Sequence, residues 1–478
     1  MSPRPSARIA TRARGRRRGF TLIELTVALV AGLLVAMSVA TLSHEATATF
    51  NEEVRISAAE ATLRTAADRL RADLQRAAYM STPNIEMDPS VARPFGQATP
   101  FLANPTQVLQ SILYTPGTST VNGAALVLDA KNGISPASVD ISGNLSSVDA
   151  FEVQTKNQVG ACCQVLLAAS SPSIYRLLNA NGAGVPDPNA DAELQNIFAP
   201  APPVGTAAVT NAQFWVRYTD TVTGKSEYIL TCSAATANRI AGVITTGTTV
   251  QPYVFLDRCP LTGAQTQQTI TNGNTGGTAT VNPVVTARWQ IVAPGAAAAN
   301  GGPPAQDIAA LDNSPMVAGA DPNKYDLVRS LVDGNGNLLA QTTEIIAEYA
   351  VGLDLAFTVD NQAGTSGANP ALQAYDFADP LNTANAASVS TLLNAPVGGG
   401  GGSKDPQRIR AVKFMIQTRA AIPDRTASIP VATGAGSGTF LYRYCMNPAG
   451  CAGNALQWAR VRTIVSEVAL TNQQQSFF

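Results

Sequence analysis

The feature that most constrains this chain is an apolar segment near its amino terminus. The residues from Leu25 to Ser43 include no charged side chain, and this length of 19 residues is close to the about 20 that a helix needs to cross a bilayer. No proline lies between Phe20 and Tyr79, so the same helix can continue beyond the apolar segment. The sequence therefore predicts a long amino-terminal helix whose first half spans a membrane.

The residues before this segment are strongly basic. Residues 1–19 contain seven arginines and no acidic residue, so the positive-inside rule keeps the amino terminus in the cytoplasm and exports the rest of the chain. Removal of these seven charges would change the formal net charge from −1 to −8. We therefore expect the lipid bilayer, and not a nucleic acid, to be a partner of this chain.

One carboxylate, Glu24, interrupts the start of the apolar segment. A charged group inside a bilayer costs at least a few kcal/mol, so this acid is a candidate functional residue. Two simpler interpretations are a plain single-span anchor and a secretory signal peptide that is cut after the A-x-A sequence at residues 46–48. Neither explains the sequence GFTLIE at residues 19–24, and the apolar segment is longer than that of a usual signal peptide.

The sequence GFTLIE after a basic leader resembles the class III signal of type IV pilins and type II secretion pseudopilins. The resemblance implies that a prepilin peptidase cuts between Gly19 and Phe20 and that Phe20 is then N-methylated. It also implies that Glu24 is the buried glutamate of this family. Cleavage creates a positive amine on Phe20, and we expect Glu24 to pair with the amine of a neighbouring subunit as an assembly contact, because pairing offsets the cost of both buried charges.

Residues 44–79 are expected to continue the helix in amphipathic form. A narrow apolar stripe recurs there at helical spacing and predicts packing on a globular head. The stripe consists of Ile56, Ala59, Leu63, Ala66, Leu70 and Ala77. Turn-forming residues at 81–84 predict the end of the helix.

Residues 80–478 are predicted to be rich in β-strands joined by long loops. The predicted strands are Ala124–Ala130, Ala150–Gln154, Gln164–Ala168, Gln213–Tyr218, Glu227–Cys232, Tyr253–Asp257, Val284–Val292, Lys324–Val332, Ile345–Val359, Arg408–Thr418, Thr439–Tyr444 and Trp458–Leu470. The fold class is therefore α+β, with a long helix packed on an antiparallel sheet and an enlarged, loop-rich head. This organisation is that of type IV pilin-like proteins.

The carboxy-terminal part carries a second resemblance. Residues 327–336, 344–357, 409–416 and 460–472 resemble, in order and approximate spacing, blocks of the PilW-type minor pilins. We therefore divide the chain into a cleaved leader (1–19), a transmembrane or filament-core helix (20–43), its amphipathic continuation (44–79), a β-rich elaboration (80–320) and a PilW-like part (321–478).

The resemblance implies a non-enzymatic minor pilin that primes or caps a type IV pilus. Its expected partners are the prepilin peptidase, other minor pilins, the major pilin and the inner-membrane assembly platform. It would lie in the inner membrane with a periplasmic carboxy-terminal domain and later in the surface pilus. The alternatives are a J-type pseudopilin of type II secretion and a pilus-tip adhesin that binds its ligand through residues 85–320.

Six cysteines and a single histidine, His44, show no zinc-binding spacing. Export favours disulfides. Proximity in sequence predicts the pairs Cys445–Cys451 and Cys232–Cys259. Cys162 and Cys163 would then need a vicinal bridge or other partners.

The sequence contains no motif that we recognise as a cofactor-binding or catalytic motif. Two acidic segments resemble calcium-binding loops, but for both of them a calcium site is the weaker explanation. Asp333, Asn335 and Asn337, with Glu344 at the twelfth position, partly match a calcium-binding loop, but an Asn-Gly turn between two strands explains the same residues. Residues 187–193 alternate acids and amides in a similar way but have Phe198 at the twelfth position.

Overall fold

The computed structural model describes most of the predicted helix and the strands of the head. The described residues are 21–93, 109–115, 120–121, 124–125, 136–178, 187, 189–200, 213–232, 240–246, 249–261, 279–292, 324–339, 342–360, 372–375, 377, 406–422, 443–446 and 458–473. The chain forms two compact units, Met1–Ala58 and Ala59–Phe478.

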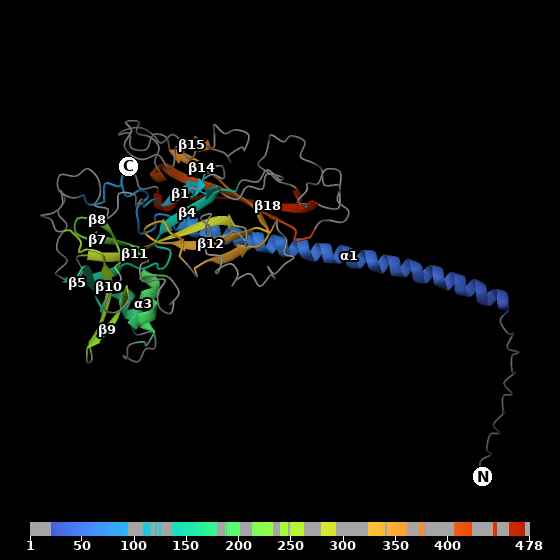
Figure 1. Cartoon of the computed structure of the whole chain (residues 1–478), viewed down its shortest axis with the longest axis horizontal. Helices are drawn as coiled ribbons and strands as arrows, with labels where there is room; N and C mark the ends of the chain where they lie inside the picture. The colour runs from blue at the N-terminus through green and yellow to red at the C-terminus, as the bar shows by residue number, and fades with distance from the viewer. Residues whose placement is uncertain are drawn as a thin grey trace, which may run out of the picture. The chain divides into compact units, whose positions relative to one another are not determined.

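The long helix α1 extends from Leu22 to Gln75 and is drawn in blue in Figure 1. Within the second unit, Leu63, Ala66 and Leu70 are buried, as the helical spacing predicts. The helix ends four residues before Tyr79, because Ala78 and Met80 have positive φ angles of 59° and 49° and the Ala78 N–H donates to the Ser142 carbonyl at 3.0 Å. This bond directs the chain toward the sheet instead of into another helical turn.

The described strands form two large antiparallel sheets and one short hairpin. The eleven-stranded sheet contains β1 (Ile112–Thr115), β4 (Ser138–Gly143), β5 (Phe151–Val159), β6 (Cys162–Leu167), β7 (Trp215–Asp220), β8 (Ser226–Leu230), β9 (Ala241–Thr246), β10 (Thr249–Leu256), β11 (Ala279–Val292), β12 (Asp326–Val332) and β13 (Glu344–Ala347). The five-stranded sheet contains β14 (Ala350–Asp360), β15 (Leu372–Tyr375), β16 (Ile409–Arg419), β17 (Arg443–Cys445) and β18 (Trp458–Ala469). The remaining elements are the hairpin β2 (Thr120–Val121) and β3 (Ala124–Ala125), the helices α2 (Pro172–Leu178) and α3 (Ala190–Phe198), and the 3-10 helices η2 (Pro406–Arg408) and η4 (Thr471–Gln473).

Strand β11 organises the larger sheet because its two halves have different partners. Residues 279–284 pair with β7, and residues 285–289 pair with β4 on one side while residues 286–292 pair with β12 on the other. Its two ends also contribute to different cores. Trp289 lies in a first core with residues of α1, whereas Val281 lies in a second core with residues of the strands β5, β6 and β10. In Figure 1 the green strands β5–β10 and helix α3 form a group distinct from the orange and red strands β14–β18.

The first core fixes α1 to the sheets of the second unit. Leu63, Leu70 and Leu74 of the helix pack against apolar residues of β1, β4, β11, β14, β16 and β18. A buried polar contact adds specificity: the Asp73 carboxylate accepts from Trp289 Nε1 at 2.9 Å and from Arg329 Nε at 2.7 Å. The fold is therefore the predicted α+β arrangement, with a long amino-terminal helix and a head of antiparallel sheets.

Several predicted boundaries differ from the structure. The strand predicted at residues 345–359 is two strands, β13 and β14, because Tyr349 turns the chain with a φ angle of 54°. The strands β1, β2, β4, β9 and β15 and the helices α2 and α3 were not predicted. Parts of the predicted strands Ala124–Ala130 and Thr439–Tyr444 lie outside the described residues.

Candidate functional site

The described part of the candidate site begins at Thr21, at the start of α1. The Thr21 N–H and hydroxyl both donate to Glu24 Oε2 at 3.0 Å, and the Glu24 N–H donates back to the Thr21 hydroxyl at 3.2 Å. This reciprocal arrangement is a capping box, which satisfies N–H groups that the first turn of a helix leaves without partners. Glu24 therefore has a local structural role as well as the predicted assembly role. The spacing T-x-x-E in the sequence carries this signal, although we did not predict it.

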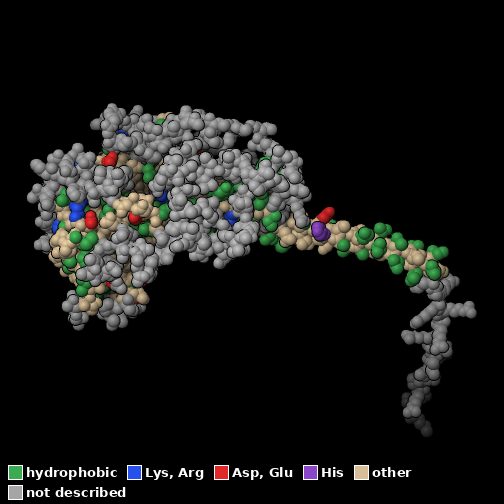
Figure 2. Space-filling model, in the orientation of Figure 1, with side chains coloured by type: hydrophobic (Ala, Val, Ile, Leu, Met, Phe, Trp, Pro, Cys, Tyr) green, Lys and Arg blue, Asp and Glu red, His purple; other side chains and the backbone are tan. Residues whose placement is uncertain are grey.

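Beyond the cap, the large apolar side chains of α1 from Leu22 to Leu42 are exposed in the described part of the chain. Leu22 is 79% exposed and Leu34 is 60% exposed, and the other large apolar residues up to Leu42 are similar. Figure 2 shows these hydrophobic side chains along the helix. Within the described part of the chain, α1 is the helix that is long and apolar enough to cross a membrane. So large an exposed apolar surface on a single helix requires lipid or other protein chains to cover it.

Residues 14–40 match the family model described as the prokaryotic N-terminal methylation motif. The chain carries this motif. The match includes the GFTLIE sequence and most of the apolar segment, so it supports the class III signal and processing by a prepilin peptidase. No curated protein and no solved structure was found to match the chain. The cleavage residues Gly19 and Phe20 lie outside the described residues, and their roles remain predictions.

The disulfides pair differently from the prediction. Cys162 is bonded to Cys232, and Cys163 is bonded to Cys259. The predicted pair Cys232–Cys259 is therefore wrong, because both cysteines bond to adjacent residues of β6 instead. Cys445 is disulfide-bonded, but Cys451 lies outside the described residues, so the pair Cys445–Cys451 stays a prediction.

The two disulfides leave β6 on opposite faces because successive strand residues alternate in direction. Cys163 is fully buried in the second core, whereas Cys162 packs with Tyr253 and Phe255 in a separate small cluster. The segments after β8 and after β10 are thereby fixed to the same point of β6. Sequence proximity could not reveal this arrangement, because it depends on which strands are neighbours in the sheet.

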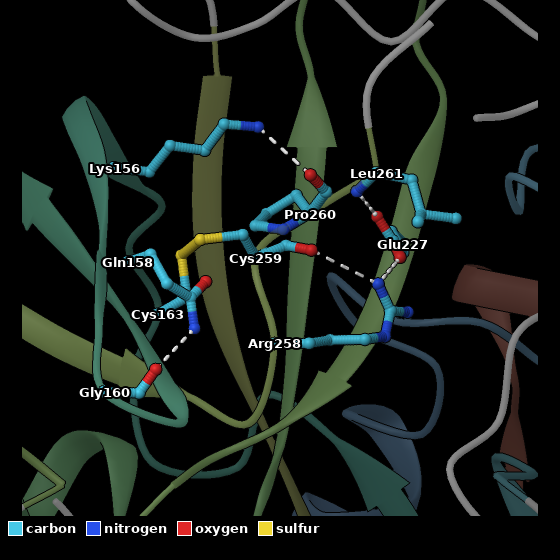
Figure 3. Close-up of a disulfide and its surroundings, with 9 residues drawn as sticks. All are labelled: Lys156, Gln158, Gly160, Cys163, Glu227, Arg258, Cys259, Pro260 and Leu261. Atoms are coloured by element: carbon cyan, nitrogen blue, oxygen red, sulfur yellow. Dashed lines mark hydrogen bonds and ion pairs between the residues drawn. A yellow bond between two sulfur atoms is a disulfide. The ribbon is translucent and has the colours of Figure 1, made fainter. Parts of the chain in front are cut away.

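Polar contacts reinforce the segment that contains Cys259 (Figure 3). The buried Glu227 carboxylate forms an ion pair with Arg258 and accepts from the Leu261 N–H at 2.9 Å. Lys156 Nζ donates to the Pro260 carbonyl at 3.1 Å, and burial lowers the pKa of this amine, although the charge of Glu227 opposes the shift. These contacts rigidify residues 257–261.

The weak calcium candidate is a turn in the structure. The Asp333 Oδ1 atom accepts from the N–H groups of Asn335 and Asn337 at 2.9 and 2.8 Å, and Gly336 has a φ angle of 87°. The Glu344 carboxylate forms an ion pair with Arg69 instead, with 3.3 Å between Glu344 Oε2 and Arg69 Nη2. Within the described ranges, no cluster of three or more His, Cys, Asp and Glu side chains is arranged to hold a metal ion. The turn interpretation accounts for these residues.

The second acidic segment covers a strand edge. Asp191 Oδ1 accepts from the Val243 N–H at 2.8 Å, and Gln195 Oε1 accepts from the N–H groups of Ile240 and Ala241 at 3.1 and 3.0 Å. Helix α3 therefore satisfies the backbone N–H groups of Ala241 and Val243 in the first half of β9. Covered edges of this kind prevent pairing with other chains.

Proposed function

We propose that this chain is a minor pilin that is processed between Gly19 and Phe20 and then primes or caps a type IV pilus. The observation that carries the proposal is the methylation motif at residues 14–40, which continues directly into a helix whose apolar side chains are uncovered. The PilW-like blocks of the carboxy-terminal part support the assignment to the minor pilins. The proposed partners are the prepilin peptidase, the assembly platform, the major pilin and other minor pilins.

The proposed role of Glu24 is to receive the Phe20 amine of a neighbouring subunit. Both groups are charged and lie at an apolar helix end, so each is costly alone in lipid or in a filament core. The capping box holds one carboxylate oxygen of Glu24 against Thr21. A carboxylate has about four acceptor sites, so capping and an intersubunit ion pair are chemically compatible.

The direct test is mass spectrometry of the amino-terminal peptide of the mature protein from its native host. We expect a chain that begins at Phe20 and carries one methyl group on its amine. A chain that begins at Thr49 would instead support a secretory signal peptide and would overturn the proposal. An unprocessed amino terminus would support a plain membrane anchor.

The assembly contact is tested by Glu24→Ala, with processing and filament incorporation measured separately. We expect normal cleavage and a loss of incorporation, because the neighbouring amine loses its counterion. Glu45→Ala is the matched control, since it removes an exposed acid from the same helix outside the methylation motif. Normal incorporation of the Glu24 variant would contradict the contact.

A second candidate function is a pilus-tip adhesin. The observation that favours it is the disulfide-linked second core, which is formed mostly by residues of the 85–320 region and contains no residue of α1. Deletion of the gene separates the functions, because priming predicts a loss of pili whereas adhesion predicts normal pili that no longer attach. The related assignment as a J-type pseudopilin is distinguished by whether the same deletion abolishes type II secretion instead.

A further inference from the structure

The two disulfides at β6 have a crossed connectivity. Cys162 is bonded to Cys232, and Cys163 is bonded to Cys259. The bonds close overlapping loops with sequence separations of 70 and 96 residues. Four cysteines pair in three different ways, and the observed map is not the one that joins each cysteine to its neighbour in the sequence.

The pairing that chain entropy favours is a different one. Cys232 and Cys259 are much closer to each other in the sequence than either is to β6. The entropic cost of closing a loop grows with the logarithm of its length, so an unfolded chain joins Cys232 to Cys259 about four-fold more often than to Cys162. The cysteines that are left over are then the adjacent Cys162 and Cys163.

Chain entropy also fails to separate the observed map from its swapped form, in which Cys232 pairs with Cys163 and Cys259 pairs with Cys162. Each swapped loop differs in length from an observed loop by a single residue, because Cys162 and Cys163 are adjacent. The free energies of closing these loops are therefore practically equal. Only the folded sheet distinguishes the two maps.

The register of β6 makes this distinction. Cys163 lies in the second core with Cys259 packed against it (Figure 3), whereas Cys162 lies in the separate small cluster with Cys232 packed against it. Successive side chains of a strand point to opposite faces, so the swapped bonds require β6 to turn over. The polar Gln164 would then enter the second core. A chain with swapped bonds is therefore prevented from forming the observed sheet.

The second core is completed by a strand that follows all four cysteines in the sequence. This core includes Val281, Val285 and Ala287 of β11. The chain is made and exported from its amino-terminal end, so the cysteines reach an oxidising compartment before β11 does. Oxidation at that stage follows chain entropy, because the packing that selects the observed partners is not yet formed.

We propose that the head is a substrate of a disulfide isomerase, an enzyme outside the cytoplasm whose reactive thiolate converts mispaired forms into the observed map. The inference goes beyond the proposed function. It rests only on the expected export of the head, which disulfides favour because they persist in oxidising compartments.

The exchange needs no net oxidant or reductant. In the form with Cys232–Cys259 and Cys162–Cys163 bonds, the isomerase thiolate attacks the Cys259 sulfur, forms a mixed disulfide and releases the Cys232 thiolate. This thiolate attacks the Cys162 sulfur, forms the Cys162–Cys232 bond and releases the Cys163 thiolate. The Cys163 thiolate then attacks Cys259 in the mixed disulfide, forms the Cys163–Cys259 bond and returns the isomerase thiolate.

The test uses the full chain in two strains of one host that differ only in a periplasmic disulfide isomerase. Both strains contain a thiol oxidase and a prepilin peptidase. Pulse labelling measures the chain synthesised, and tandem mass spectrometry of linked peptides assigns the partners of Cys162 and Cys163. We expect the yield of the observed map per chain synthesised to be at least five-fold lower without the isomerase, with Cys232–Cys259 and swapped pairs in its place.

Two matched controls remove the choice of partners. Cys162→Ser combined with Cys232→Ser leaves Cys163 and Cys259 as the remaining pair of the four. Cys163→Ser combined with Cys259→Ser leaves the other pair. Each variant has one pairing open among these cysteines, so the remaining bond should form in equal yield in both strains.

Equal yields of the observed map in both strains would overturn the inference. A dependence of the control variants on the isomerase as large as that of the parent chain would also overturn it, because the choice of partners would not be the cause. The amino terminus is sequenced in the same samples. A start other than Phe20 would count against the proposed function alone, whereas a start at Phe20 with a map independent of the isomerase would overturn this inference alone.

Discussion

At the scale of single residues, Asp73 is the clearest buried charge that connects α1 with the sheet. Its side chain is 9% exposed, and its carboxylate accepts from both Trp289 and Arg329. The Arg329 side chain is itself only 11% exposed, so it depends on this counterion. Removal of one partner from a buried pair leaves the other charge uncompensated in a medium of low polarity.

We therefore expect Asp73→Asn to lower the free energy of unfolding by about 3 kcal/mol, measured by urea denaturation of the full chain in detergent. The asparagine keeps the size of the side chain but removes its charge. Asp68→Asn is the control, since Asp68 is exposed and its ion pair with Arg71 spans 3.7 Å at the surface. The control should change stability by at most about 0.5 kcal/mol, and equal effects of both variants would contradict this role.

Asp354 is also a buried acid, but its environment disfavours the charged form of the carboxyl group. Burial raises the pKa of its carboxyl to about 6, against the weaker opposing effects of the bonds from Tyr114 Oη and the Leu355 N–H, at 2.9 and 2.8 Å. Because the folded pKa lies above the unfolded value, the folded state binds more protons between about pH 4 and pH 6. This group therefore favours folding at low pH and loses that contribution as the pH rises.

The expected result is a fall in the free energy of unfolding of about 2 kcal/mol between pH 4 and pH 6.5 that is attributable to Asp354. Asp354→Asn should remove this fall, since the amide does not titrate and its oxygen can still accept from Tyr114. Denaturation curves at several pH values measure the effect. A profile of the variant parallel to that of the parent chain would contradict it, and Asp68→Asn should leave the profile unchanged.

At the scale of elements, the sequence predicted which segments are regular better than it predicted their partners. The long apolar strands β11, β16 and β18 were recognisable because their apolar residues are contiguous or alternate. Strand β4 was missed because it is polar in sequence. Its Asp140 is nevertheless buried, since Arg288 donates to both of its carboxylate oxygens at 2.6 and 2.7 Å. Burial of that kind depends on a partner that is distant in sequence.

The disulfides illustrate the same limit. Proximity in sequence placed Cys232 with Cys259, but the sheet brings β10 beside β6, and the bridge between Thr231 and Leu256 brings the end of β8 beside β10. Both cysteines therefore reach β6. The sequence alone predicts features that are local, such as the GFTLIE motif and the turn at Asp333. It does not predict the disulfide pairs, because these depend on the order of the strands in the sheet.

Each cross-link should stabilise the second core measurably. Replacement of Cys163 and Cys259 together by alanine opens a loop with a sequence separation of 96 residues, and we expect a loss of about 4 kcal/mol in the free energy of unfolding. The measurement is denaturation of the oxidised full chain, and the control is the same comparison after full reduction, in which the variant and the parent chain should differ much less. A variant as stable as the oxidised parent would contradict the prediction.

At the scale of the whole molecule, every buried core residue that the structure describes comes from the second unit. The first helical residue with a buried apolar side chain is Leu63, and the unit begins at Ala59. The fold of the head therefore does not use the apolar segment before it. That segment is available to lipid and, by the function proposed above, later to other subunits.

A chain that begins at Ala59 should consequently fold alone, with a cooperative thermal transition and the Cys162–Cys232 and Cys163–Cys259 disulfides intact. A chain that begins at Ala77 is the control, because it lacks the buried residues Leu63, Leu70 and Leu74 of the first core. Circular dichroism and peptide mapping measure both properties. Aggregation of the longer fragment, or cooperative folding of the shorter one, would contradict the division into these units.

The paired bonds at β6 also determine how this protein would respond to tension. A pulling force that enters the chain before Cys162 and leaves it after Cys259 passes through the Cys163–Cys259 bond, so the backbone between these residues carries none of the load. With a sequence separation of 96 residues, roughly 300 Å of contour length is thereby withheld from extension. Under mechanical load the oxidised head would thus lengthen far less than its residue count suggests.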